Sequence, residues 1–114
     1  MIEVYGIPNC DSVKKARTLL NTQKIAYTFH DHKKQGVPET SLHEWVKVKG
    51  WETLLNRKGT TWRALDDAIK ASVVDADSAI AVMMTHPSTI KRPIVTKGNT
   101  LIVGLDETAL RALR

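Results

Sequence analysis

Apolar and polar residues follow three successive patterns in the first thirty residues. Residues 2–6 form a short β-prone apolar segment, which Pro8 ends. From Cys10 or Asp11 onward, the apolar residues recur at the spacing of one helical face: Val13, Ala16, Leu19 and Leu20. Apolar and polar residues then alternate over 25–30, as in a half-buried strand. The pattern therefore predicts a strand, a helix and a second strand, and Asn9 is the expected N-cap of the helix.

The middle of the chain has helical spacing interrupted by short breaks. A polar loop over 31–38 precedes an amphipathic helix whose apolar residues are Leu42, Trp45 and Val46. Gly50 is the expected end of that helix, and 51–55 is read as a further helical turn. A short helix is predicted from Trp62, and a longer one over 75–85.

The last quarter of the chain changes to strand patterns. Residues 94–96 and 101–103, joined by a turn at Gly98 and Asn99, are typical of a β-hairpin. Asp106 is placed to cap a final helix that carries Leu110 and Leu113. A strand-helix-strand half followed by a hairpin and a helix predicts an α/β, thioredoxin-like fold. We expect a four-stranded mixed sheet flanked by helices, with a helical insertion over about 31–90 between the second and third strands.

Length and charge limit the classes of function. The 114 residues, of which 42% are hydrophobic and 25% charged, suit one domain over 1–114. The net charge of +5 comes from scattered basic residues, so direct nucleic-acid binding is not expected. No apolar run is long enough to cross a bilayer, and the N-terminal residues do not resemble a signal peptide. A cytoplasmic protein without membrane contact is the expectation.

Cys10 is the single cysteine of the chain. A single cysteine cannot form a disulfide within the chain. The four histidines lack the spacing of metal ligands, so no metal site is expected. At the start of a helix, unpaired amides and the helix dipole lower a thiol pKa and make the sulfur a better nucleophile. On position alone, a small buried residue is an equally good interpretation of Cys10.

Four segments carry a family resemblance that extends over almost the whole chain. They are VYGIPNCDSVKKAR (4–17), LLNRKGTTWR (54–63), HPSTIKRPIV (86–95) and VGLDE (103–107). In this order the chain resembles the ArsC/Spx/YffB family, which includes glutaredoxin-linked arsenate reductases and thioredoxin-fold regulators of RNA polymerase. The lone cysteine and the GTTWR stretch are most similar to the YffB-type branch.

The resemblance implies that Cys10 is a catalytic nucleophile and that Arg92 lies beside it, before a cis Pro93. It implies a glutathione-linked thiol oxidoreductase with no bound cofactor. Its partners would be glutathione or a glutaredoxin, and a small oxidised substrate. The residues expected to bind glutathione or substrate are Asn9, Ser12, Lys14, Arg57, Arg63 and Pro93.

The chain departs from its relatives at three positions. Arsenate reductases of this family place three arginines around the cysteine. At the corresponding positions this chain has Arg92, Asn56 and Gly104, so one of the three arginines is present. Each lost charge-assisted bond is worth about 1.5–3 kcal/mol, so inefficient arsenate reduction is expected. Val13 replaces the second cysteine of the switch found in Spx regulators. Two alternatives stay open: a non-enzymatic Spx-type regulator that binds RNA polymerase, and a glutathione-binding protein with little catalysis.

Overall fold

The computed structural model describes residues 1–113, and these divide into two compact units. The sheet unit contains Met1–Gln35 and the residues from Arg92 onward. The helical unit is Gly36–Lys91, close to the predicted insertion. Of the helices within 1–113, none has both the length and the apolar character needed to span a bilayer. The expectation of one domain over 1–114 stays a prediction.

The sheet unit is built on four strands in the order β2-β1-β3-β4. The strands are β1 (Ile2–Gly6), β2 (Thr28–Asp31), β3 (Ile94–Lys97) and β4 (Thr100–Val103). β1 pairs with β2 in parallel, whereas β3 is antiparallel to both β1 and β4. The predicted mixed sheet, including the β3-β4 hairpin, is confirmed.

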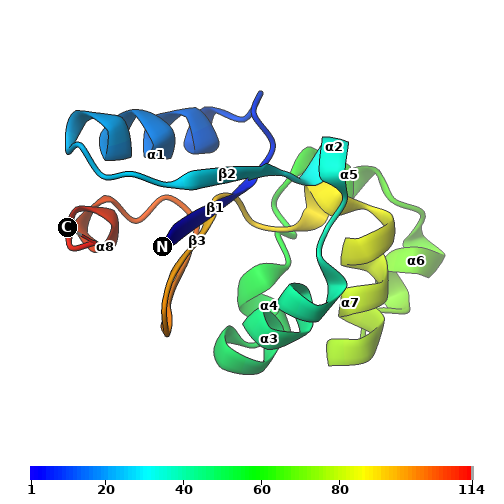
Figure 1. The fold of residues 1–114 in the computed structure, drawn as a ribbon. Helices are drawn as coiled ribbons and strands as arrows, with labels where there is room; N and C mark the ends of the chain where they lie inside the picture. The colour runs from blue at the N-terminus through cyan, green and yellow to red at the C-terminus, as the bar shows by residue number, and fades with distance from the viewer. Residues whose placement is uncertain (114) are drawn as a thin grey trace. The chain divides into compact units, whose positions relative to one another are not determined.

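Two helices flank this sheet and share its hydrophobic core (Figure 1). α1 (Asp11–Thr22) follows β1, and α8 (Glu107–Arg111) follows β4. Because side chains alternate along a strand, only one set from each strand faces the two helices. The core consists of Ile2, Val4, Ala16, Leu20, Val95, Ile102, Leu110 and Leu113.

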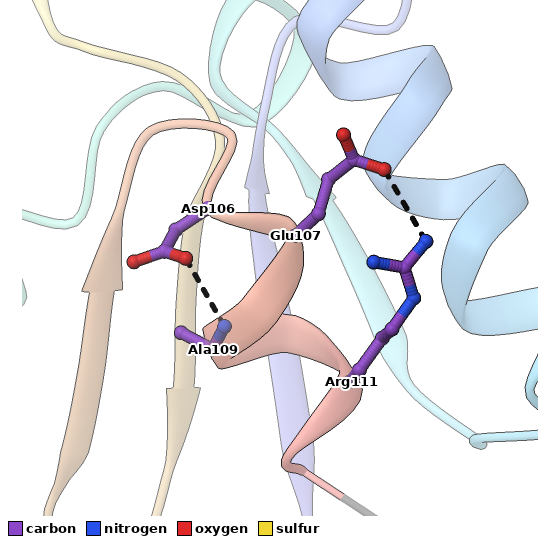
Figure 2. A network of polar contacts seen from close by, with 4 residues as sticks. All are labelled: Asp106, Glu107, Ala109 and Arg111. Carbon is purple, nitrogen blue, oxygen red and sulfur yellow. Dashed lines mark hydrogen bonds and ion pairs between the residues drawn. The ribbon is translucent and has the colours of Figure 1, made fainter.

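The start of α8 is capped as the sequence predicts (Figure 2). The Asp106 carboxylate accepts a hydrogen bond of 3.1 Å from the Ala109 amide, one of the donors without a partner inside the helix. One turn along, Arg111 Nη2 lies 3.5 Å from Glu107 Oε1. These local contacts stabilise the short helix, and its buried Leu110 packs in the sheet unit's core.

The helical unit consists of short helices around their own core. They are α3 (Glu39–Lys49), α4 (Trp51–Leu54), α5 (Thr60–Ala64), α6 (Asp67–Ala71), α7 (Ala76–Thr85) and the 3-10 turn η1 (Pro87–Thr89). Gly50 ends α3 at a φ of 87°, as expected for a glycine cap. α7 begins after a capping box in which Asp75 accepts from the Ser78 amide at 2.9 Å.

The structure differs from the predicted elements in several places, including the start of α5 at Thr60 and the end of α8 at Arg111. β2 starts at Thr28 instead of residue 25, because Ile25 still donates to the Leu20 carbonyl and Thr28 is the residue opposite Glu3. The loop predicted over 31–38 contains a helix, α2 (His32–Gln35), whose amides at Lys33 and Lys34 donate to the Asp31 carboxylate. α6 was missed because its five residues are too few for a helical period to stand out.

The contact between β1 and α1 depends on the absence of a side chain at Gly6. A Cβ on Gly6 would lie 2.7 Å from Val13 Cγ2, and Val13 is fully buried and stiff. We expect Gly6→Ala to lower the free energy of unfolding by about 1–3 kcal/mol, measured by urea denaturation. Val13→Ala in the same chain should relieve the clash, so the double variant should lose less than the sum of the single losses. Additive losses would contradict this contact.

Candidate functional site

Three strand ends converge at one edge of the sheet. Because β1 and β2 are parallel, their carboxyl ends meet there, with Gly6 opposite Asp31. β3 runs the other way, so its first residue, Ile94, also lies at this edge, opposite Tyr5. Polar groups therefore gather here from segments far apart in the sequence: the residues after β1, those after β2, and those before β3.

A tight turn after β1 brings Cys10 to the start of α1. The Cys10 amide donates to the Ile7 carbonyl at 3.1 Å, and Cys10 has extended dihedral angles. Cys10 is therefore the N-cap residue, and the prediction of Asn9 in that position was wrong by one residue. Asn9 lies inside the turn, where its side-chain oxygen is 3.4 Å from Lys14 Nζ.

Opposing influences act on the pKa of the Cys10 thiol. Burial of the half-buried sulfur is the largest and raises the pKa. The Val13 amide, hydrogen bonding from the Arg92 side chain, the Ser12 amide and the Arg92 charge all lower it, and together they prevail. The Cys10 side chain makes no capping hydrogen bond to α1. The Ser12 and Val13 amides therefore act mainly by stabilising the negative charge of the thiolate. The pKa of Cys10 is thus lowered, in the expected direction.

The Arg92–Pro93 peptide is cis, as expected. Pro93 is buried, and its carbonyl accepts a hydrogen bond of 2.8 Å from the Gly104 amide at the end of β4. This bond ties the segment before β3 to the end of the hairpin. Arg92 itself is half-buried, with its guanidinium near the Cys10 sulfur.

Sequence reasoning did not assign His32 to this edge. Its side chain is 1% exposed, and its ring centroid lies 6.0 Å from that of Tyr5. Burial and then the Arg92 charge lower the pKa of His32 to about 4, so the imidazole is neutral near pH 7. The available signal was topological: His32 directly follows a strand parallel to the one before Cys10.

The remaining predicted binding residues fall into two groups. Ser12 lies beside the sulfur through its amide, and Lys14 on the exposed side of α1 contacts Asn9. Arg57 and Arg63 are exposed residues of the helical unit. The Arg57 guanidinium lies 5.0 Å from the Trp51 ring centroid, and the Arg63 carbonyl accepts from Lys70 Nζ at 3.2 Å. A part for either arginine in ligand binding stays a prediction.

Metal ligands do not cluster in the part of the chain that the structure describes. Within residues 1–113 there is no group of three or more histidine, cysteine or carboxylate side chains placed to hold an ion. His30 Nε2 instead lies 2.7 Å from Glu3 Oε1, on the sheet face opposite the shared core. The side chains at this edge include the Cys10 thiol, the Arg92 guanidinium, the Asp31 carboxylate and the His32 imidazole.

Comparison with protein families gives a match over residues 5–113 to the model of the ArsC family. The chain belongs to the ArsC family. The match includes the turn before Cys10, the segment with the cis proline and the hairpin, so it covers every element that forms this edge.

Individual relatives agree with this membership. A solved structure titled YffB protein is 46% identical, with a TM-score of 0.93, and the match covers 98% of this chain and 97% of that one. An arsenate reductase (ArsC) related protein from Brucella melitensis is 43% identical over 98% and 92% of the two chains, with a TM-score of 0.76. The global transcriptional regulator Spx 1 of Lactococcus lactis is 26% identical over 98% and 88%.

Gly104 stands where the family resemblance leads us to expect an arginine in an arsenate reductase. Its φ is 84°, in the left-handed region that glycine adopts without strain. An arginine would be strained in this backbone conformation. The glycine at position 104 therefore suits the observed backbone. Asn56 replaces the second arginine; its side chain accepts from the Lys58 amide at 3.2 Å.

The effect of the Arg92 charge on the Cys10 thiol should be measurable as a shift in the pH dependence of its alkylation. We expect Arg92→Gln to raise the pH midpoint of Cys10 alkylation by about one unit, because the thiolate loses a hydrogen bond and a neighbouring charge. The wild-type midpoint should lie below the ~8.5 of a free cysteine. Arg111→Gln, which removes an exposed cation from α8, is the matched control. Equal midpoints in wild type and Arg92→Gln would show that Arg92 does not act on the sulfur.

The low pKa of His32 predicts a loss of stability in acid. The unfolded histidine titrates near ~6.5 and the folded one at about 4, so the unfolded state binds more protons between these values. The free energy of unfolding should therefore fall as the pH drops from 6.5 to 4, by at most about 3 kcal/mol. In His32→Phe this part of the fall should disappear in urea denaturation, whereas His43→Leu should keep it. The same acid loss in His32→Phe would contradict the assignment.

Proposed function

We propose that this protein is a single-cysteine, glutathione-dependent thiol oxidoreductase. One observation carries the proposal: the only cysteine of the chain lies at the start of α1 beside Arg92, with a lowered pKa. A larger thiolate fraction at neutral pH makes a thiol faster in disulfide exchange. Because the chain has no second cysteine, the thiol that completes the reaction must come from another molecule.

The reaction we propose uses two molecules of glutathione. The Cys10 thiolate attacks the glutathione sulfur of a mixed disulfide, breaks the S–S bond and releases the substrate thiolate, which takes up a proton. Cys10 is then disulfide-bonded to glutathione. A second glutathione thiolate attacks that sulfur, releases the Cys10 thiolate and leaves oxidised glutathione. The net reaction converts the mixed disulfide and one free glutathione into the substrate thiol and oxidised glutathione, so each step exchanges one thiol for one disulfide. A glutaredoxin thiol would serve equally in the second step.

Arg92 has two roles in this proposal. It stabilises the Cys10 thiolate before attack, and again as the leaving group when the mixed disulfide is resolved. A guanidinium has the planar arrangement of donors that suits a carboxylate of glutathione. The Ser12 amide acts on the sulfur from the first turn of α1, and in this proposal Asn9, in the preceding turn, would line the same site. Arsenate is expected to be a poor substrate, because an oxyanion needs the cations that Asn56 and Gly104 replace.

A non-enzymatic function is favoured by a different observation, the similarity to the regulator Spx 1. In that case the protein would bind a subunit of RNA polymerase and act without thiol chemistry. Val13 stands at the second position of the C-x-x-C switch, so a redox switch within the chain is not available to it. This alternative predicts stable capture of a polymerase subunit by both wild type and Cys10→Ser.

Cys10→Ser tests the proposed chemistry. We expect turnover of a small glutathione mixed disulfide to fall to background, since a serine hydroxyl is a poor nucleophile in disulfide exchange. The measurement is a coupled assay of oxidised glutathione formation, with circular dichroism and urea denaturation to verify folding.

Two arginine variants complete this test of the proposed chemistry. Arg92→Gln should retain Cys10 but lose about 10-fold in rate below neutral pH, whereas Arg111→Gln should match wild type. Normal turnover by the folded Cys10→Ser variant would refute the enzyme. Absence of turnover together with polymerase capture would favour the regulator.

A further inference from the structure

The outer side of β4 is an open edge of the sheet. β4 is the last strand in the order β2-β1-β3-β4, so within residues 1–113 it pairs on one side only, with β3. An open strand edge presents backbone amides and carbonyls that can pair with another strand. The register with β3 determines which residues of β4 present these groups.

The hydrogen bond after β4 fixes which residues face outward. The Gly104 amide donates to the Pro93 carbonyl at 2.8 Å, so the backbone groups at position 104 point toward the β3 side. In an antiparallel pair, residues bonded to the neighbouring strand alternate with residues whose amide and carbonyl point away from it. The amides and carbonyls of Leu101 and Val103 therefore face the open side of β4.

The side chains of β4 do not protect this edge from pairing. Proteins commonly protect edge strands with charged residues or prolines. β4 has the sequence TLIV, which contains neither. The strand at the other edge, β2, ends with Asp31 and continues directly into α2, which contains Lys33 and Lys34. The uncharged edge of the sheet is therefore the one at β4.

A hollow of about 630 Å³ lies beside this edge, between the hairpin and α8. Its lining includes Ile102 of β4, and Ala109 and Ala112 of α8. A charged residue of the lining, Lys97, donates from Nζ to the Leu113 carbonyl at 2.9 Å. The ion pair of α8 lies on the other side of the helix, toward α1 (Figure 2). The side of α8 next to β4 is thus small and apolar, which permits the close approach of another chain.

We propose that β4 pairs antiparallel with β4 of a second copy of this chain, forming a symmetric dimer. With Ile102 on the two-fold axis, Leu101 lies opposite Val103 of the second copy, and Val103 opposite its Leu101. Each of these pairs exchanges two hydrogen bonds, because both residues face outward. This register satisfies the outward amides and carbonyls of both copies.

A second copy fits this edge better than an extended segment of another protein. In the proposed register Thr100 lies opposite Gly104 of the second copy, so no charged residues meet along the strands despite the net charge of +5 on each chain. The two-fold axis also places both α8 helices on the same face of the joined sheet, where Ala109 and Ala112 can be covered. A single extended segment would pair with β4 but leave this surface of α8 exposed. Because the strand contact is short, we expect a micromolar dissociation constant.

The dimer leaves both thiols accessible. Val103, the last residue of β4, lies opposite Ile94, at the edge of the sheet that holds Cys10. Since the two copies of β4 run in opposite directions, the two thiols lie toward opposite ends of the joined sheet. The dimer therefore does not depend on the proposed thiol chemistry, and a failed glutathione assay would leave it standing.

Sedimentation velocity from about 1 µM to about 500 µM tests the dimer. We expect the mass of wild type to rise from 12.7 kDa toward twice that value. Leu101→Lys places a charge on the edge, and Val103→Pro removes an outward amide without loss of a bond to β3, so both should stay monomeric. Thr96→Lys, the control, adds the same charge to the same sheet face one strand inward and should dimerise like wild type. Circular dichroism verifies folding of each variant.

Mixing charged variants tests the register. Leu101→Lys and Val103→Glu should each be monomeric alone but form a dimer together, because the register places these two positions opposite each other. A mixture of Leu101→Lys with Val103→Lys, the control, should stay monomeric. Wild type that is monomeric at every concentration would overturn the proposal and leave the edge to an extended segment of another protein. Dimers of folded Leu101→Lys or Val103→Pro, or equal behaviour of the two mixtures, would also overturn it.

Discussion

The interaction on which the rest of this structure depends is between the Arg92 guanidinium and the sulfur of Cys10. Burial alone would keep the thiol protonated, and the first amides of α1 together with the arginine reverse that preference. Arg92 is the only side chain among these influences, the others being backbone amides of α1. The fold contributes by bringing a residue eighty-two positions along the chain to the start of α1.

That proximity follows from sheet topology. A parallel pair, β1 and β2, and an antiparallel partner, β3, place two carboxyl ends and one amino end at a common edge. Gly6 lets β1 approach Val13 of α1 closely, and the turn from Ile7 to Cys10 then directs the thiol to that edge. The Gly104 amide fixes the segment before β3 through the Pro93 carbonyl. Each of these contacts contributes little stability by itself, but all of them help to orient the Cys10 sulfur and the Arg92 side chain.

Membership of the ArsC family extends over this arrangement. A site with one cation beside the sulfur suits thiolate formation and disulfide exchange better than tight binding of an oxyanion. The proposed exchange with glutathione is consistent with a chain that brings one thiol and requires a second from its partner.

The sequence by itself determined the order of the four strands, the helices α1 and α8 beside them, the hairpin, the cap at Asp106 and the place of Cys10 at a helix start, because these depend on residues close together in the chain. The family resemblance added Arg92 beside the thiol and the cis proline. Only the tertiary structure decided where β2 begins, since that start is set by its register with Glu3. It also decided that His32 is buried near Arg92, because burial and charge at that residue come from strands that meet only when the sheet forms.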